Sequence, residues 1–281
     1  MVTLENVSFA YKKQVVLKQI TTTFNNGQLY GLLGDNGAGK TTLLRLMSGL
    51  LFPDTGKITV QGIEPQQRIP SFLQSVFFVP DSVFFPGISI PQYADGLSPF
   101  YKNFSKQQFI RNLTAFDIGY DNDIEALSFG QQKKLFLSFA LATNTPYLLL
   151  DEPTNGLDIL SKSAFKELLS GYMDDTKCVI ISTHQVSDIS NLLDHVSIMR
   201  NGQLIFSQSM EAISQQLLFN SRTPAESEIL FAEDSLKGST TITPNDSGYP
   251  SGVDIELLYK AVMANREQIN TLFNHTENIA L

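Results

Sequence analysis

The sequence contains a single cysteine, Cys178, among its 281 residues, which excludes an intrachain disulfide framework. This cysteine lies in the apolar run CVIIST, where we expect its thiol to serve as a small buried hydrophobic group. No apolar run approaches the ~18 residues that a membrane-spanning helix needs. The first residues, MVTLENVSF, lack the basic and apolar regions of a signal peptide. Together these absences predict a soluble protein in a reducing, cytoplasmic setting.

Basic residues are also scarce, with 20 Lys and Arg against 28 Asp and Glu and a net charge of -8. An acidic chain is poorly suited to wrapping a phosphate backbone, so we expect no nucleic-acid partner. The charge is uneven, because residues 214–281 hold four basic and nine acidic side chains (4 − 9 = −5). The composition also becomes rich in Ser, Thr and Pro after Phe219. Residues 214–281 are therefore predicted to form a separate C-terminal accessory extension, with self-association or regulation as its expected role.

Strand and helix patterns alternate along residues 1–213, which predicts an α/β fold. The first two patterns, VTLENVSFAY and VVLKQITTTF, are rich in β-branched residues and read as strands. QLYGLLG then reads as a buried strand, and KTTLLRLMSGL after it has helical spacing. Residues 90–145 are mostly helical in pattern. In the extension, EILFA and STTIT are weak strand candidates, and VDIELLYKAVMANREQINTLF is a helix candidate whose apolar stripe suits packing on the domain or on a second copy.

A nucleotide site is predicted at GDNGAGKTT, which fits the phosphate-loop pattern G-x-x-x-x-G-K-[ST]. In such a loop, backbone N–H groups and the N-terminus of the following helix bind phosphate oxygens. Lys40 would reach the β- and γ-phosphates, Thr41 would ligate Mg²⁺, and Thr42 would donate to a further phosphate oxygen. A ligand-free glycine turn is the alternative, but the strand–loop–helix order favours a site. The candidate residues are Gly34, Asn36, Gly37, Ala38, Gly39, Lys40, Thr41 and Thr42.

Two adjacent carboxylates follow the apolar strand pattern YLLLDEP. Asp151 would hold Mg²⁺ directly or through water, and Glu152 would polarise the attacking water as general base. A buried strand that merely ends in solvated acids is common in isolation. Its pairing with the phosphate loop makes catalysis the favoured interpretation.

Taken in order, GDNGAGKTT, LSFGQ, YLLLDEPTNGLD and ISTH resemble the motifs of an ABC-type ATPase subunit over roughly residues 1–213. The pattern is most similar to single-domain ATP-binding subunits that serve separate ABC-2-type membrane permeases. The resemblance implies a P-loop NTPase core with a mixed, mainly parallel sheet and an N-terminal antiparallel β-subdomain. It also implies an inserted helical subdomain at residues 90–145, and a small α+β extension would follow the core.

The resemblance also implies roles for residues outside the two motifs above. Tyr11, at the end of the first strand, would stack on adenine, although a strand-end aromatic also suits covering the core. Ser128, Gly130 and Gln131 match the signature loop, which caps the γ-phosphate bound to a second copy.

Two further residues gain roles from the same resemblance. Asp158 matches a loop that communicates across the dimer. His184 matches the switch histidine that contacts the γ-phosphate. His195 and His275 are interpreted as ordinary histidines.

Two positions depart from the family pattern. Phe129 replaces a Gly of the signature loop, and we expect its ring to pack away from the phosphate because Ser128 and Gly130 keep the contacting groups. Asp81 stands where the family usually has a Gln that touches Mg²⁺ or the attacking water and senses the permease. Asp81 would still bind the metal but, when ionised, cannot donate a hydrogen bond.

The resulting hypothesis is an ATPase whose two copies close over two MgATP and drive a separate polytopic permease, as an exporter. It would lie on the inner face of the cell membrane as a peripheral subunit. Aromatic residues near YADGLSPFYKNF would line a groove for the permease, or simply belong to the core. A soluble ABC ATPase without a permease is the alternative. A regulatory module with little catalysis is disfavoured by the intact Lys40, Glu152 and His184.

Overall fold

The computed structural model describes residues 1–220, 229–235 and 238–274. Its centre is a six-stranded sheet in the order β5-β6-β7-β3-β8-β9. The first five strands of this order run parallel, and β9 returns antiparallel to β8. The predicted α/β fold with a mixed, mainly parallel sheet is confirmed. The strands are β3 (Gln28–Leu33), β5 (Val76–Val79), β6 (Tyr147–Asp151), β7 (Cys178–Thr183), β8 (His195–Arg200) and β9 (Gln203–Ser209).

Both faces of this sheet are covered, because its strands are apolar on both sides. Leu148 and Leu150 of β6 pack into one hydrophobic cluster with the helices α5 (Phe129–Ala142) and α6 (Ile159–Tyr172). Leu149 points to the other face and joins a second cluster, which contains the helix α1 (Lys40–Met47). An antiparallel sheet in the order β2-β1-β4 completes that second layer, with β1 (Val2–Tyr11), β2 (Gln14–Phe24) and β4 (Thr55–Val60).

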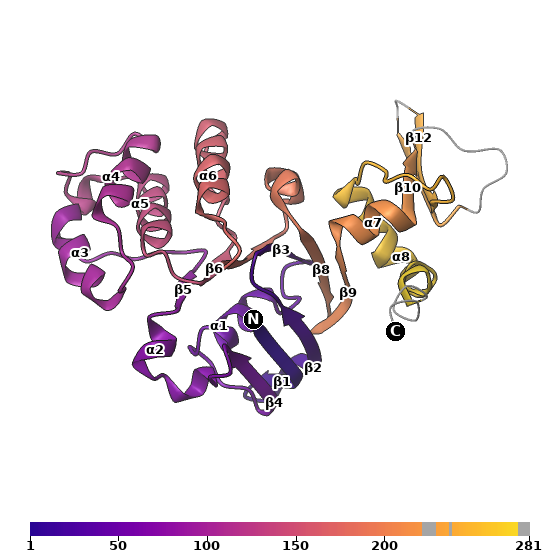
Figure 1. Cartoon of the computed structure of the whole chain (residues 1–281), viewed down its shortest axis with the longest axis horizontal. Helices are drawn as coiled ribbons and strands as arrows, with labels where there is room; N and C mark the ends of the chain where they lie inside the picture. The colour runs from indigo at the N-terminus through magenta and orange to yellow at the C-terminus, as the bar shows by residue number, and fades with distance from the viewer. Residues whose placement is uncertain (221–228, 236–237, 275–281) are drawn as a thin grey trace.

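The helical segment lies at one end of the molecule (Figure 1). It holds α3 (Ile90–Leu97), α4 (Lys106–Ala115) and α5, with short 3₁₀ turns at η2 (Ser98–Phe100) and η3 (Ile124–Ala126). Its helices start at serines: Ser89, Ser105 and Ser128 each accept a hydrogen bond from the backbone N–H three residues on. Short elements elsewhere are η1 (Pro65–Gln67), α2 (Pro70–Leu73), η4 (Val186–Asp188) and η5 (Ser190–Leu192).

The C-terminal part lies at the opposite end (Figure 1). It forms a small antiparallel sheet in the order β10-β12-β11, flanked by α7 (Met210–Gln216) and α8 (Ile255–Asn274). The strands are β10 (Leu217–Asn220), β11 (Phe231–Ser235) and β12 (Gly238–Pro244), so the two weak strand candidates overlap β11 and β12. Helix α8 is interrupted at Asn265, which has φ −132° and ψ 50°.

Helix α8 packs on the same chain's own core. Leu258, Val262 and Ile269 belong to the large cluster that includes Ile205 and Phe206 of β9. The expected boundary at residue 214 falls inside α7, and the division into domains stays a prediction. Among the described residues, none of the helices combines the length and apolar character needed to cross a bilayer.

Candidate functional site

The phosphate loop, Asp81, the carboxylate pair and His184 meet at one edge of the central sheet. Parallel strands present their carboxyl ends at the same edge, where ligands bind in open α/β sheets. Gly34 follows β3, Asp81 lies just after β5, Glu152 follows β6 and His184 follows β7. Residues far apart in sequence are thereby brought to a single site.

The phosphate loop between β3 and α1 depends on glycine at two close approaches. Gly34 has φ +155°, and a Cβ there would lie 2.5 Å from the carbonyl oxygen of Met199. Gly39 has φ +108°, and its Cβ would meet the Leu17 side chain at 2.7 Å. Helix α1 begins immediately afterwards at Lys40, so its free N–H groups and positive dipole end face the loop. This geometry suits a bound phosphate.

Lys40 is 6% exposed and lies inside this loop. Its Nζ donates to the carbonyl oxygens of Gly34 at 2.6 Å and Asp35 at 3.2 Å. The ammonium also lies 3.9 Å from Oε1 of Glu152. Burial lowers the pKa of Lys40, and the neighbouring carboxylates of Glu152 and Asp151 oppose that shift. The Lys40 side chain therefore lies inside the loop, between the carbonyls of Gly34 and Asp35 and the carboxylate of Glu152.

Asp151 is 3% exposed at the end of β6 and has hydroxyl partners. The Thr41 hydroxyl donates to its two carboxylate oxygens, at 2.8 and 3.0 Å, and the Ser182 hydroxyl donates to Oδ1 at 2.5 Å. Within the described part of the chain, no three His, Cys, Asp or Glu residues cluster as a metal cage. Mg²⁺ usually takes one or two protein ligands and completes its shell with phosphate oxygens and water. The Thr41 hydroxyl and the Asp151 carboxylate fit that donor set.

Glu152 and His184 form a close pair at the same edge. His184 Nδ1 lies 2.9 Å from Glu152 Oε1, and the His184 backbone N–H donates to Oε2 at 3.4 Å. The Glu152 side chain is only 13% exposed, and its backbone has φ +47°, a left-handed value that non-glycine residues rarely adopt. Such outliers cluster at functional sites. The Glu152 carboxylate is thereby held between His184 and Lys40, at the edge where the phosphate loop begins.

A cavity of about 400 Å³ is lined by most of these elements, whereas Gly34 and His184 line a smaller, separate cavity of about 60 Å³. Besides the loop from Asp35 to Thr42, the walls of the larger cavity include Tyr11, Asp81, Asp151 and Glu152, which were all expected from the sequence. Asp35, Gln14 and Val16 also line it and were not among the expected residues. Gln14 is brought to the cavity wall because it pairs directly with Tyr11 across the β1–β2 hairpin, and side chains of cross-strand partners lie next to each other.

The signature segment lies apart from this cavity in the same chain. Ser128 caps α5 by accepting from the Gln131 backbone N–H at 3.3 Å, while the Gln131 side chain accepts from the Ser128 N–H at 2.9 Å. Phe129 is 57% exposed at the first turn, so its ring lies on the surface of the chain. Among the described residues that line the cavity, Ser128, Gly130 and Gln131 do not occur.

Asp158 caps α6 and is not a lining residue of the cavity either. Its carboxylate accepts from the Ser161 hydroxyl at 2.7 Å and backbone N–H at 2.9 Å, and from Lys134 Nζ at 3.0 Å. These hydrogen bonds hold the pKa of Asp158 well below its usual range. Lys134 thereby ties the start of α6 to α5.

Asp81 is engaged by two groups that sequence reasoning did not identify. Its Oδ1 accepts from Lys133 Nζ at 3.4 Å and from Asn155 Nδ2 at 3.2 Å. Lys133 stands in the polar run QQKK, which resembles a solvated helix face, so no local signal marked it. The role of Asp81 at the metal stays a prediction.

The other two histidines lie away from these contacts. His195 packs against Tyr30 with ring centroids 5.0 Å apart, and burial lowers its pKa to about 4. His275 falls outside the described residues.

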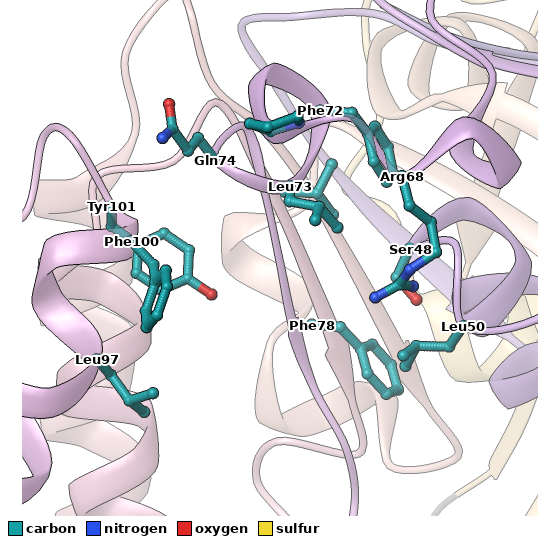
Figure 2. A pocket seen from close by; sticks show the side chains of 12 residues that line it. Ser48, Leu50, Arg68, Phe72, Leu73, Gln74, Phe78, Leu97, Phe100 and Tyr101 are labelled. Atoms are coloured by element: carbon teal, nitrogen blue, oxygen red, sulfur yellow. The ribbon is translucent and has the colours of Figure 1, made fainter.

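A second, more apolar cavity of about 490 Å³ lies between part of the helical segment and the core (Figure 2). Leu97, Phe100 and Tyr101 form one wall, and Leu73 and Phe78 lie on the facing wall. Phe100 is 64% exposed although it lines an apolar groove. A concave groove lined mainly by apolar side chains is the usual form of a binding site for another molecule.

Known proteins resemble the chain in sequence and in fold. A family model described as ABC transporter matches residues 17–155. An ABC transporter ATP-binding protein from Methanosarcina acetivorans is 33% identical over 222 residues, covering 74% of this chain and 77% of the relative.

Two solved structures extend the comparison. A subunit from Clostridium perfringens, part of the ABC transporter complex cbiONQ, has a TM-score of 0.62 and 26% identity, covering 74% of this chain and 88% of its own. A dimeric ATP-binding cassette in a post-hydrolysis state, bound to ADP and Pi, has a TM-score of 0.65 and 21% identity, covering 74% of this chain and 98% of its own.

Proposed function

This chain belongs to the ABC transporter family as an ATP-binding, ATP-hydrolysing subunit, and we propose that two copies of it close over two MgATP to drive a separate membrane permease. The observation that carries the proposal is a divided site. The cavity contains the phosphate loop, Asp151 and Glu152, whereas Ser128 and Gly130 lie outside it at the start of α5. A second copy that supplies those two residues would complete each site. The dimeric form of the structural relative supports this arrangement.

Hydrolysis follows from the carboxylate pair. Glu152 accepts a proton from the attacking water, whose oxygen bonds to the γ-phosphorus while the bond to the β–γ bridging oxygen breaks. ADP and phosphate leave. His184 orients the carboxylate and contacts the γ-phosphate, and Lys40 stabilises the β- and γ-phosphate oxygens. Thr41 and Asp151 would hold Mg²⁺, which neutralises phosphate charge when bound.

The adenine and the second copy use the remaining predicted residues. Tyr11 is 42% exposed on the wall of the cavity, which suits stacking on a planar base. Ser128 presents its hydroxyl, and the first turn of α5 presents free backbone N–H groups to the phosphate of the partner copy. Phe129 lies beside them on the surface that the partner would cover.

The permease would dock in the apolar groove between the helical segment and the core. A groove of about 490 Å³ lined by Leu73, Phe78 and Phe100 fits the apolar face of a short helix. Hydrolysis at the sheet edge would then change the distance between the groove's two walls. We propose export as the direction, because the motifs are similar to those of subunits that serve ABC-2-type permeases. The chain would lie on the cytoplasmic face of the membrane.

Purification of the tagged chain from mild-detergent extracts of its native cells tests the proposal. We expect a polytopic membrane protein in stoichiometric amount. Phe100→Ser should reduce recovery of this membrane protein. Tyr249→Ser is the control: it removes a similarly exposed aromatic ring outside the groove (Tyr249 is 79% exposed and Phe100 64%) and should leave recovery unchanged. Recovery of soluble partners alone would favour an ABC ATPase without a permease. Equal recovery with both variants would reject the groove as the docking site.

A further inference from the structure

Lys133 is a buried cation that the proposed chemistry leaves without a role. It lies in the second turn of α5, and its side chain is 1% exposed. Lysine is almost never fully buried unless its charge is paired. Its partners therefore indicate what the charge is for.

Those partners come from two other segments of the chain. Lys133 Nζ donates to the backbone carbonyl of Glu152 at 2.6 Å and lies 3.4 Å from Oδ1 of Asp81. Asn155, which follows Glu152 by three residues, donates to the same Asp81 oxygen at 3.2 Å. The ammonium group thus joins α5 to the ends of β5 and β6. Burial lowers the pKa of Lys133, and the charges of Asp81 and Glu152 oppose that shift.

The carbonyl that Lys133 holds belongs to a residue with an unusual backbone. Glu152 has φ +47°, which persists in a non-glycine residue only where the surroundings enforce it. On one side, its N–H donates to the Ser182 carbonyl at 3.0 Å. On the other side, its carbonyl accepts from Lys133. The peptide groups flanking its Cα are thereby fixed, and the side chain is directed toward His184.

We propose that Lys133 is a positioning residue for ATP hydrolysis, holding the backbone of Glu152 and linking it to Asp81 and helix α5. This inference rests on the proposed role of Glu152 as general base. Within the described residues, the Lys133 ammonium donates hydrogen bonds to Asp81 and to the Glu152 carbonyl and not to the phosphate loop or Tyr11, so it acts on turnover through Glu152. A movement of α5 relative to β6 would displace the carbonyl and with it the carboxylate.

The same contact gives Asp81 a function in this chain. Its side chain is 44% exposed, and one oxygen is already engaged by Lys133 and Asn155. An acidic residue at this position supplies the counter-charge that a buried lysine requires, which a neutral Gln would not. The helical segment that lines the permease groove is therefore connected to the catalytic edge through a charged pair.

The test measures kcat, KM and equilibrium nucleotide binding for Lys133→Met in the full chain. Met keeps the length of the side chain but removes the charge and the donors. We expect kcat to fall by about 10–100-fold, because a displacement on the order of 1 Å at a catalytic group has effects of that size. Nucleotide affinity should stay within about twofold, since the phosphate loop keeps its contacts.

Lys177→Met is the matched control. Lys177 is 7% exposed and donates to the carbonyls of Asn144 at 2.7 Å and Thr145 at 3.4 Å. It precedes β7 and so lies at the opposite edge of the sheet from the site. Its replacement should lower the melting temperature and leave kcat unchanged. If Lys177→Met lowered kcat as much as Lys133→Met, the effect would be structural and the proposal rejected.

Glu152→Gln, measured in parallel, distinguishes failure of the positioning role of Lys133 from failure of the proposed role of Glu152 as general base. An inactive Glu152→Gln with a fully active Lys133→Met would overturn only the positioning role. A fully active Glu152→Gln would show that Glu152 is not the general base, and the positioning role of Lys133 would be rejected with it. A selective loss of kcat in Lys133→Met, with Glu152→Gln inactive and Lys177→Met active, would support both.

Discussion

The carboxyl edge of the central sheet is held together by buried charges, whereas the C-terminal extension is held to the chain mainly by apolar packing. At the edge, Lys40 and Lys133 both reach Glu152, one at its carboxylate and one at its carbonyl. In the extension, Val262 and Ile269 of α8 pack against β9 in the large hydrophobic cluster. The Lys260–Glu233 ion pair there is exposed, at 49% and 40%, and contributes little.

The two kinds of contact respond differently to substitution. A charged group at the edge lies beside the nucleotide site, so its removal alters the chemistry as well as leaving its buried partners unpaired. An apolar side chain has many partners, and its removal lowers stability in proportion to the cavity left behind. Substitutions at the edge should therefore show their main effect on activity, and those in α8 should show theirs on stability.

The largest effect is expected from Glu152→Gln. It removes the proton acceptor but keeps the size of the side chain, so kcat should fall by roughly 10²–10⁴ while nucleotide still binds. With MgATP, the variant should elute at twice the monomer mass in size-exclusion chromatography, because hydrolysis no longer releases the two copies. Near-normal turnover would show that Glu152 is not the general base. A variant that stays monomeric at saturating ATP would contradict the proposed ATP-dependent dimer.

Ile269→Ala probes the other region. Ile269 is fully buried in α8, and truncation should reduce the free energy of unfolding by about 2–5 kcal/mol, measured by urea denaturation. The milder Ile269→Val should cost about 0.5–1.5 kcal/mol. At a temperature where both variants remain folded, kcat should match the parent chain. A loss of kcat in the folded variants would mean that the extension takes part in catalysis.

Lys40→Ala is expected to weaken both nucleotide affinity and turnover. A charge-assisted contact with phosphate contributes about 1.5–3 kcal/mol, so affinity should fall by roughly 10–100-fold in equilibrium titrations. The contrast with Glu152→Gln is diagnostic, because one variant loses binding and the other keeps it. Unchanged affinity in Lys40→Ala would contradict the role of the phosphate loop.

The motifs at the edge could be anticipated because each is contiguous in sequence. The loop that ends in Lys40, the apolar strand before Asp151, and the strand before His184 each follow from local spacing, and parallel strands bring their ends together. The confirmed fold class follows from the same alternation of strands and helices. Their individual chemical roles remain predictions.

The contacts of Lys133 could not be anticipated in this way. Helical periodicity does not reveal which turn of α5 meets the loop after β6, and a run such as QQKK usually faces solvent. The break at Asn265 in α8 is likewise invisible, since the apolar spacing continues through it. Both features are fixed by tertiary packing rather than by neighbours in sequence.

The smallest effect is expected where the two regions touch. The Tyr259 hydroxyl of α8 donates to Oδ1 of Asp35, in the phosphate loop, at 2.8 Å across 224 residues of sequence. Burial and the Asp35 carboxylate raise the pKa of Tyr259 to about 12, so the phenol keeps its proton at physiological pH. Tyr259 also lines a small cavity with His184. The extension is thus in direct contact with the loop that would hold the phosphates.

Tyr259→Phe removes only this hydroxyl and keeps the ring. If the hydrogen bond helps order the loop, nucleotide affinity should weaken by about two- to fivefold, as expected for a partly exposed contact of ~1 kcal/mol or less. Tyr249→Phe makes the same chemical change on an exposed ring of the extension and should leave affinity unchanged. Equal nucleotide affinities in the two variants would show that the hydrogen bond between Tyr259 and Asp35 does not contribute to nucleotide binding. A loss of nucleotide affinity in Tyr259→Phe alone would mean that the extension, although held mainly by apolar packing, helps to order the phosphate loop at the charged edge.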